Sequence, residues 1–241
     1  MKTTEFKELK PKIVLGVAAH PDDLEFGAGG TIAKWAGQGA KVYYLVLTDG
    51  SKGSSDKNIS PKELAKIRRQ EQHDAAKVLS VKEVFFCNYE DCKLDCSQDV
   101  KRDIARQIRI VKPDVVITMD PTMIYAPDSG FINHPDHRAA GQATLDAVYP
   151  LARDHLSFPE LINEGLEPHS TPTILLVNLE RQNWFEDISS TIDKKMKALA
   201  SHASQMQNID GVQFMLKNSA KDMGKKSGNS FAEGFMRIDV R

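Results

Sequence analysis

The sequence predicts an α/β protein with a doubly wound, mostly parallel sheet and helices on both faces. Two observations carry this prediction. Strand-length apolar runs alternate with helical patterns over residues 12–150, which is typical of parallel strands joined by crossover helices. In addition, 41% of the residues are hydrophobic, which is ordinary for a chain with a full core. Because no repeat or sharp change in composition divides the 241 residues, we expect a single domain over 1–241.

The individual elements follow from their local patterns. Short apolar runs predict strands at residues 12–19, 41–48, 83–89, 114–120 and 173–179 and at the end of 228–240. Helical patterns cover residues 30–39, 61–80, 99–111, 137–152 and 189–206. The helix over 61–80 has a clear start, because Ser60 is a favourable cap and Pro61 suits the first helical position. Residues 121–137 form a long connection after a strand, and such loops are usually functional or mobile.

Charge, apolar run length and cysteine count exclude several classes of partner. The 32 basic and 33 acidic residues leave a net charge of -1, which argues against a nucleic-acid or anionic-membrane partner. The longest apolar runs, IVLGVAA and VYYLVL, are far shorter than the roughly 20 residues of a membrane span. The start MKTTEFKELKPK has no apolar secretion signal, and Cys87, Cys92 and Cys96 are an odd number of cysteines. We therefore expect a cytoplasmic protein that acts on a small molecule.

The tripeptide His-Pro-Asp occurs twice, although histidine and proline are both scarce. The first copy, within HPDD, follows the strand over 12–19, and the second, within HPDH, follows the strand over 114–120 after a connection. In an open doubly wound sheet these first and fourth strands are neighbours across the switch point, where ligands bind at the carboxyl ends. The two distant motifs are therefore expected to meet in one crevice.

The residue types in the two motifs predict a catalytic zinc site. Two imidazoles and one carboxylate, with a position left for water, form a common ligand set of such sites, and His20, Asp23 and His137 would supply it. The carboxylate of Asp22 then fits a general base that takes a proton from water. A protonated imidazole of His134 fits the group that, together with the metal, stabilises the oxyanion of an amide-hydrolysis intermediate.

Simpler interpretations compete with a metal site. Asp22 or Asp23 would also suit the cap of the helix expected near Gly29, and a single histidine is often only structural. The segment GAGGT suggests a phosphate loop, but it lacks both the full dinucleotide fingerprint and the Walker lysine. The three cysteines lack the close pair of a structural zinc site. Because the two His-Pro-Asp copies both follow strands that border the switch point, we favour the shared metal site.

These segments, in their order along the chain, resemble one enzyme family. AAHPDDLEFGAGGTIA, LTDGSKGS, RRQEQHDAAKVL, VVITMDP, HPDHRAAG and ALASHASQ are similar to segments of the PIG-L/LmbE-like zinc-dependent N-deacetylases. The resemblance implies a Rossmann-like fold and removal of acetyl groups from N-acetylglucosaminyl compounds and related amides. It also implies that His20, Asp23 and His137 are the zinc ligands, that Asp22 is the general base and that His134 is the electrostatic or acid partner.

Two further residues enter through the resemblance. Arg68 matches a family arginine that contacts the sugar, although KIRRQEQ also has the composition of a solvated helix face. His202 matches a late motif near the active site, within or between subunits, although a surface helix histidine would look the same. The resemblance also suggests a homo-oligomer, either a trimer or a hexamer.

The sequence departs from the family pattern at two places. Many members have a glutamate directly after the aspartate pair, whereas this chain has Leu24 and then Glu25. Some members have a tyrosine two residues before the HPDH histidine, where this chain has Ile132, so that either Tyr125 replaces it from elsewhere in the loop or the contact is absent. The leading hypothesis is a zinc-dependent deacetylase of an N-acetylated amino sugar or its conjugate. The alternatives are another amide at the same metal, or a protein that binds a sugar or metabolite without catalysis.

Overall fold

The computed structural model describes residues 6–127 and 130–241, and its centre is one seven-stranded sheet. The strand order is β3-β2-β1-β4-β7-β9-β8. The strands span Ile13–Ala18 (β1), Lys41–Thr48 (β2), Glu83–Tyr89 (β3), Val115–Met119 (β4), Thr173–Val177 (β7), Trp184–Asp187 (β8) and Ala232–Asp239 (β9). Strands β3, β2, β1, β4 and β7 pair in parallel, whereas β9 pairs antiparallel with both β7 and β8. The predicted mostly parallel, doubly wound sheet is therefore confirmed.

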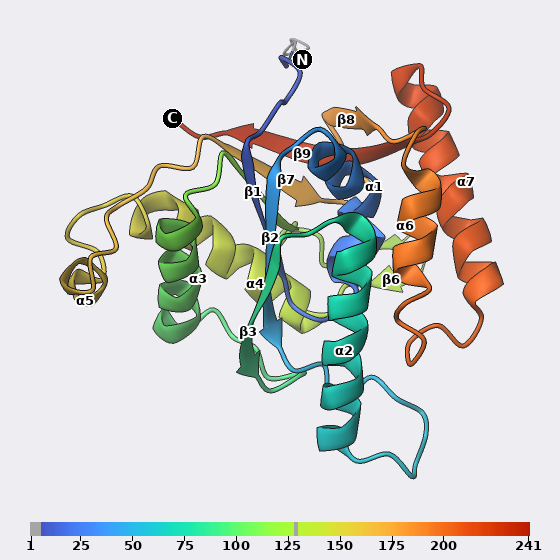
Figure 1. Cartoon of the computed structure of the whole chain (residues 1–241), viewed down its shortest axis with the longest axis horizontal. Coiled ribbons are helices and arrows are strands. Elements are labelled where there is room, and N and C mark those ends of the chain that lie inside the picture. The colour runs from blue at the N-terminus through green and yellow to red at the C-terminus, as the bar shows by residue number, and fades with distance from the viewer. Residues whose placement is uncertain (1–5, 128–129) are drawn as a thin grey trace.

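Helices cover both faces of this sheet (Figure 1). One face carries α1 (Asp23–Gly37), α2 (Pro61–Leu79), α6 (Ile192–Leu199) and α7 (Ile209–Ser227). The other face carries α3 (Gln98–Val111) and α4 (Pro135–Asp146), and the short α5 (Pro159–Asn163) lies farther out on the same side. A small hairpin of β5 (Tyr125–Ala126) and β6 (Phe131–Ile132) precedes α4.

The alternating side chains of the strands build a core on each face of the sheet. In β2, Val42, Tyr44 and Val46 pack with residues of α1 and α2, whereas Leu45 and Leu47 pack with residues of α3 and α4. All five side chains are buried. Such two-sided burial explains why the parallel strands read as continuous apolar runs rather than as alternating patterns.

Several element boundaries differ from those expected from the sequence. Helix α1 begins at Asp23 rather than at Gly30, so that Gly27, Gly29 and Gly30 lie inside the helix. A Cβ on Gly27 would lie 2.7 Å from Val177, and one on Gly30 would lie 2.7 Å from Ile188. The glycines therefore allow α1 to approach β7 and the segment before α6, and they do not form a phosphate loop or a turn beneath a metal.

The C-terminal third contains the largest differences. The helix expected over 189–206 ends at Leu199, so His202 lies in a turn. The sequence analysis did not predict α7 or β8. Helix α7 buries only Ala220 and Gly224, so its sequence has no strong apolar stripe, and β8 has only four residues. The helix expected over 137–152 begins at Pro135, and residues 147–151 form a separate turn with non-helical Tyr149.

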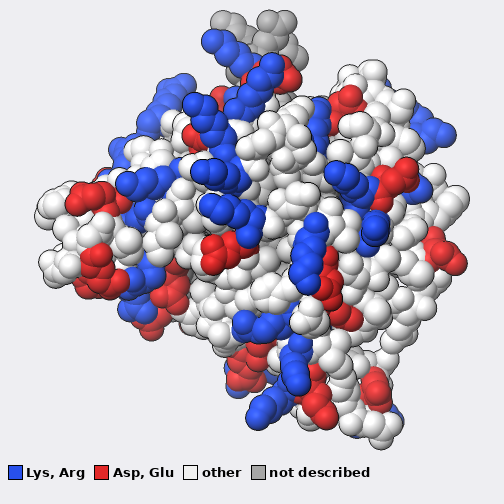
Figure 2. All heavy atoms as spheres, in the orientation of Figure 1, with Lys and Arg blue, Asp and Glu red and all other residues white. Residues whose placement is uncertain are grey.

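The surface carries charges of both signs. On the face drawn in Figure 2, basic side chains predominate toward the upper left, with acidic side chains among them, and acidic side chains are more frequent elsewhere on this face. Within the described parts of the chain, no helix combines the length and apolar character needed to cross a membrane.

Candidate active site

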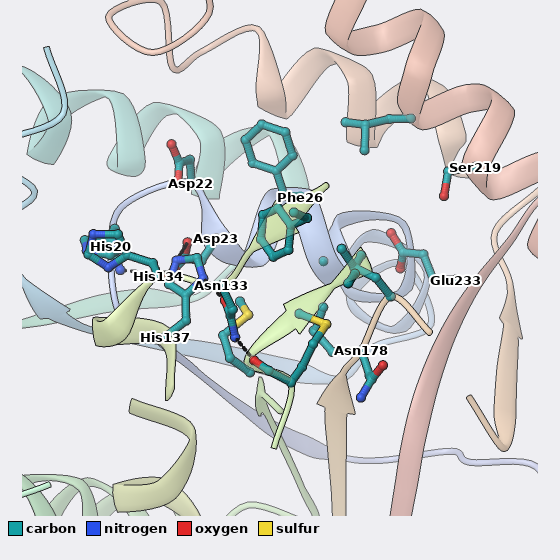
Figure 3. A pocket seen from close by; sticks show the side chains of 18 of the residues that line it. His20, Asp22, Asp23, Phe26, Asn133, His134, His137, Asn178, Ser219 and Glu233 are labelled. Atoms are coloured by element: carbon teal, nitrogen blue, oxygen red, sulfur yellow. Dashed lines mark hydrogen bonds and ion pairs between the residues drawn. The ribbon is translucent and has the colours of Figure 1, made fainter. Parts of the chain in front are cut away.

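A cavity of about 1170 Å³ opens at the carboxyl ends of the parallel strands. His20 follows β1, and His134 and His137 lie at the start of α4 after β4. The imidazole centroids of His20 and His134 are 4.6 Å apart, and those of His20 and His137 are 5.2 Å apart. Figure 3 shows these side chains gathered with Asp22 and Asp23 at one end of the cavity. The two His-Pro-Asp motifs therefore meet, as their positions after neighbouring strands predict.

The predicted metal ligands form one compact cluster. One ligand atom each from His20, Asp23 and His137 lies within 4.8 Å of the others. The Nε2 atom of His137 is 3.0 Å from Oδ1 of Asp23, and the Nδ1 atom of His20 is 3.8 Å from Oδ2 of Asp23. That Oδ2 atom also accepts a hydrogen bond of 2.8 Å from the backbone N–H of His20. The carboxylate is thus held between the two imidazoles.

The second nitrogen of each histidine ligand has a partner of its own. The Nε2 atom of His20 is 3.3 Å from Oδ2 of Asp136 and 3.2 Å from Oδ1 of Asp91. The Nδ1 atom of His137 is 3.0 Å from Oδ1 of Asn133. In zinc sites the ligating histidines almost always bind an oxygen through the other nitrogen, which fixes the ring and makes it a better ligand. The donor set and its supporting contacts therefore fit a zinc ion.

Acidic neighbours make this cluster attractive to a cation. Burial lowers the pKa of His20, but hydrogen bonds with Asp136 and Asp91 and the charge of Asp23 outweigh burial and raise the pKa to about 10. Burial raises the pKa of Asp23, but His137 and His20 outweigh burial and hold that pKa well below its usual range. A proton or a metal ion is therefore favoured between these carboxylates and imidazoles.

Asp22 lies beside the cluster in an unusual backbone conformation. Its φ of 98° is in the left-handed region, and its side chain makes no cap hydrogen bond with α1, so the helix-cap interpretation does not hold for Asp22. The backbone N–H donates to Oε1 of Gln72 over 3.0 Å, and Oδ2 is 3.3 Å from Nη2 of Arg68. Burial raises the pKa of the Asp22 carboxyl to about 6, against the opposing charge of Arg68. The carboxylate is thereby kept basic.

His134 is the N-cap of α4, and this position fixes its tautomer. Its Nδ1 atom accepts a hydrogen bond of 3.2 Å from the backbone N–H of Asp136. A neutral imidazole whose Nδ1 accepts must carry its proton on Nε2. Burial and the neighbouring His20 lower the pKa of His134. His134 therefore presents a neutral Nε2–H donor to the cavity, and the protonated imidazole expected from the sequence is not favoured here.

The structure places Arg68 at the cavity and His202 behind it. Arg68 is buried and does not lie on a solvated helix face; it donates to the carbonyl oxygens of Gly50 and Pro21 over 2.9 and 2.8 Å. His202 is fully buried and is not among the residues that line the cavity. Its Nε2 atom is 3.4 Å from Oε2 of Glu25. His202 is thus neither a surface residue nor within the cavity of this chain.

Glu25 links His202 to the backbone of Asp22. The Nε2 atom of Gln72 donates to Oε1 of Glu25 over 3.0 Å, and Oε1 of Gln72 accepts the N–H of Asp22. The buried chain His202–Glu25–Gln72–Asp22 holds the strained residue from behind. Glu25, which lies one position later than the glutamate of many family members, therefore helps to hold the backbone of Asp22 through Gln72.

Sequence reasoning missed several polar residues of the site: Asp91, Cys92, Asn133, Asp136 and Gln72. Asp91 and Cys92 follow the carboxyl end of β3, so the rule that located the histidine motifs would also have located them. The Sγ atom of Cys92 is 3.6 Å from Nε2 of His134. All three cysteines are free thiols.

The tyrosine contact considered from the sequence is not made by the β5–β6 hairpin. Tyr125 pairs with Ile132 across this hairpin, and the two residues are 61% and 78% exposed. Neither lines the cavity.

Comparison with known proteins agrees with this geometry. The model of the PIG-L family, described as GlcNAc-PI de-N-acetylase, matches residues 15–148. The chain is similar to the diacetylchitobiose deacetylase of Thermococcus kodakarensis, with 36% identity over 92% of this chain and 82% of that protein. It is also similar to a probable N-acetyl-alpha-D-glucosaminyl L-malate deacetylase 2 of Bacillus cereus, with 30% identity over 80% of this chain and 84% of that protein.

Solved structures add two neighbours. The N,N'-diacetylchitobiose deacetylase of Pyrococcus horikoshii, in complex with its inhibitor MPG, has a TM-score of 0.88 and 33% identity over 95% of this chain and 84% of that chain. The hydratase GalB of Pseudomonas putida has a TM-score of 0.79 and 24% identity over 95% of this chain and 97% of that chain. The second likeness concerns the fold alone, and one fold hosts different reactions. From the family match and the three deacetylases with 30% identity or more, the chain belongs to the PIG-L family.

Proposed function

We propose that this protein is a zinc-dependent deacetylase that hydrolyses the acetamide of an N-acetylglucosaminyl compound. The observation that carries the proposal is the cluster of His20, Asp23 and His137 with Asp22 and His134 beside it in one cavity. Relatives named for acetylated glucosamine compounds support the same substrate class. A sensor that only binds sugar would have no use for a buried carboxylate kept basic beside a metal site.

The proposed roles follow from each environment. His20, Asp23 and His137 would hold zinc, which supplies Lewis acidity that lowers the pKa of water and polarises an amide carbonyl. Asp22 takes the proton of the attacking water, because a carboxyl with a pKa of about 6 is largely ionised at pH 7. His134 donates a hydrogen bond from its neutral Nε2–H to the departing nitrogen, and Asp22 passes the proton taken from water to that nitrogen. The carbon–nitrogen bond breaks, and the products are acetate and a free amine.

Arg68 and His202 receive different roles in this proposal. We keep Arg68 as a substrate contact, because it lines the cavity while it orients the carboxyl of Asp22. His202 acts through Glu25 and Gln72 on the backbone of Asp22 and does not touch the substrate within one subunit.

The remaining expectations stay proposals. Residues 1–241 form one functional domain, which the single central sheet supports. The protein is cytoplasmic, which the three free thiols support. It assembles as a trimer or a hexamer, and light scattering after size-exclusion chromatography measures this directly.

Acetate release tests the proposed function. The protein is incubated with diacetylchitobiose and with N-acetylglucosamine, before and after removal of metal by a chelator and after zinc is returned. We expect acetate with at least one substrate, loss of release after chelation, and recovery with zinc. Undiminished release from protein shown to be metal-free would contradict zinc dependence. Turnover of another amide without any acetate from these sugars would favour the alternative substrate class.

A further inference from the structure

The cavity continues well beyond the cluster of histidines and aspartates. Its volume of about 1170 Å³ lies above the range of about 300–1,000 Å³ that is common for ligand pockets. Figure 3 shows the cavity extending from His20 past Phe26 toward Ser219 and Glu233. An acetyl group alone leaves most of this space unfilled.

The extension has an apolar lining. We call it the apolar arm and define it by five apolar side chains and one small polar one: Phe26, Val177, Met215, Leu216, Met223 and Ser219. These residues come from α1, β7 and α7, so the arm runs between helices on the same face of the sheet. Methionine is flexible and polarisable, and it adapts to chains of different shape. The arm therefore suits an apolar, extended group.

The buried charges of the arm do not call for a charged ligand. Lys195 and Glu233 form an ion pair of 2.6 Å, and both are buried. Lys195 also donates to the carbonyl oxygen of Phe26 over 2.7 Å. Glu233 accepts the backbone N–H groups of Gly30 and Thr31 over 2.9 and 2.7 Å. The pair is neutral as a whole, and its hydrogen bonds are used within the protein.

The opposite end of the cavity is polar. Lys52, Arg68 and Asp91 line it there, and Asp91 contacts His20 while Arg68 contacts Asp22. This end offers donors and acceptors for the hydroxyl groups of a sugar. The two ends of the cavity thus differ sharply in polarity.

The positions of Asp22 and His134 decide which part of an amide substrate faces each end. In amide hydrolysis the departing nitrogen must lie beside the carboxyl that brings it a proton, here Asp22 next to Arg68, and beside its hydrogen-bond donor, here His134. The Nε2 atom of His134 lies 3.6 Å from Cys92, next to Asp91, and so at the polar end. The nitrogen with its sugar therefore belongs at the polar end, and the acyl carbon on the far side of the carbonyl faces Phe26 and the apolar arm.

We propose that the apolar arm binds the acyl chain of N-acyl amino sugars, and that the protein hydrolyses amides of acyl chains longer than acetyl. This inference rests on the proposed function, because it uses the same site and the same reaction. Water adds to the carbonyl carbon, the carbon–nitrogen bond breaks, the nitrogen takes the proton, and a longer carboxylate leaves in place of acetate.

A chain-length series tests the inference. The zinc-loaded protein is given N-acetyl-, N-butanoyl-, N-hexanoyl- and N-octanoylglucosamine, and release of the free amine is measured. Each buried methylene contributes up to about fourfold in binding, so we expect kcat/KM for the hexanoyl amide to exceed that for the acetyl amide by at least about tenfold. A fall in kcat/KM with every added carbon would overturn the inference.

Alkyl glycosides of N-acetylglucosamine distinguish an acyl site from a site for the group attached to the sugar. With methyl, butyl and octyl glycosides, we expect kcat/KM to change by less than about threefold. A rise along this series, with a fall along the acyl series, would assign the arm to the glycosidic substituent and overturn the inference.

A variant that fills the arm provides the residue-level test. Ser219 is an exposed residue of α7 that lines the arm, and Ser219→Trp should place a large ring in it. We expect at least a tenfold loss of kcat/KM for the octanoyl amide and little change for the acetyl amide. The matched control is Asn218→Trp, at an exposed position of α7 that does not line the cavity. Equal effects of the two variants on both amides would contradict the inference.

Binding to the zinc-free protein separates this inference from the proposed function. Calorimetric titration with N-octanoylglucosamine should give a Kd at least about tenfold lower than with N-acetylglucosamine, and Ser219→Trp should remove the difference. Binding that strengthens with chain length, without hydrolysis of any amide, would refute the proposed function but would still support acyl binding by the apolar arm. Hydrolysis of the acetyl amide, with no tighter binding of the octanoyl compound, would refute acyl binding by the apolar arm but would still support the proposed function. A change of oligomeric state in Ser219→Trp, with no chain-length effect, would identify the arm as a subunit interface and overturn the inference.

Discussion

Asp22 and Asp23 are adjacent in the chain, yet their carboxyl groups meet opposite environments. Asp23 lies between His20 and His137, which outweigh burial and keep its pKa low. Asp22 is buried, and burial together with the charge of Asp23 outweighs the positive charges of Arg68, His202 and His20, so that its pKa rises to about 6. A carboxylate with a low pKa suits a metal ligand, whereas one with a raised pKa suits a base. The difference arises because His137 and His20 both approach the carboxylate of Asp23, whereas the carboxylate of Asp22 lies beside Arg68.

His134 combines a capping role and a proposed catalytic role, and substitution separates them. His134→Asn keeps a good cap for α4 but removes the Nε2 proton, so we expect kcat to fall by about 10²–10⁴ with little loss of stability. His134→Ala loses the cap as well and should also unfold about 1 kcal/mol more easily. Steady-state kinetics and urea unfolding measure the two effects. Full activity in His134→Asn would exclude a catalytic role for the Nε2–H hydrogen bond.

His202 makes stability depend on pH. Burial lowers its pKa, but contact with Glu25 outweighs burial and raises the pKa above the reference value of 6.5. A raised folded-state pKa stabilises the protein fully below pH 6.5, and this stabilisation is lost as the pH rises through the folded-state value. The difference in unfolding free energy between wild type and His202→Gln should therefore shrink from pH 6 to pH 9.

Urea unfolding of the zinc-free proteins measures this difference. His155→Gln, at an exposed position, is the matched control and should show no such trend. A difference that stays constant or grows with pH would mean that His202 is not charged in the folded protein.

The sequence predicts the five central site residues because they occur in two short repeated motifs. The supporting residues carry no such signal. Gln72 lies in a polar helix whose sequence resembles a solvated surface, and its contact with Asp22 depends on how α2 packs against α1. His202 becomes buried only because the chain turns after Leu199. Contacts of this kind depend on tertiary packing and are not encoded in local pattern.

At the scale of elements, the position of α4 determines whether the site forms. Helix α4 carries His137, and its Gly141 packs directly on the end of β4. A Cβ on Gly141 would lie 2.2 Å from the carbonyl oxygen of Met119, which is backbone and cannot yield as a side chain can. The missing side chain of Gly141 thus sets the distance between the second motif and the first.

Gly141→Ala should shift α4 and damage both stability and metal binding. We expect a loss of about 1–3 kcal/mol in unfolding free energy and at least tenfold weaker zinc binding. Gly37→Ala is the matched control, because nothing lies within 4 Å of its added Cβ. That change should stabilise the protein by about 0.5–1 kcal/mol and leave zinc affinity unchanged. Unchanged zinc affinity in Gly141→Ala would show that α4 need not pack this closely.

The elements that sequence reasoning missed are those without strong periodicity. Residues 23–29 contain two of the glycines that normally weaken a helix, yet they form α1 because β7 and α6 approach so closely there. Helix α7 covers the end of the sheet with few buried residues, so its pattern is weak. Parallel strands buried on both faces give the clearest sequence pattern, a continuous apolar run, and the sequence predicts the bounds of these strands nearly to the residue.

At the scale of the whole molecule, the proposed zinc site joins segments that are far apart in the chain. His20 and Asp23 follow β1, whereas His137 belongs to α4 on the other face of the sheet. A ligand that binds only the folded state stabilises it by about 2.7 kcal/mol at a concentration of 100 times its Kd. Zinc should therefore stabilise the packing of the first half of the chain against the second motif.

Zinc should raise the melting temperature of the metal-free protein by about 5–10 °C under these conditions. Asp23→Asn should lose most of this rise, because the carboxylate between the two histidines is gone. Asp210→Asn, on the first turn of α7, is the control and should keep it. Differential scanning calorimetry measures the shift, and an equal rise in all three proteins would place zinc elsewhere.

The central claim is that Asp23 is a metal ligand and that Asp22 takes a proton from the attacking water. Paired assays of Asp22→Asn test this claim most directly. Zinc content and acetate release are measured on the same preparation of the variant and the wild type. The account predicts one zinc per chain in both, with kcat lowered by about 10²–10⁴ in the variant. Wild-type activity in Asp22→Asn, or loss of its zinc, would contradict the division of roles between the two aspartates.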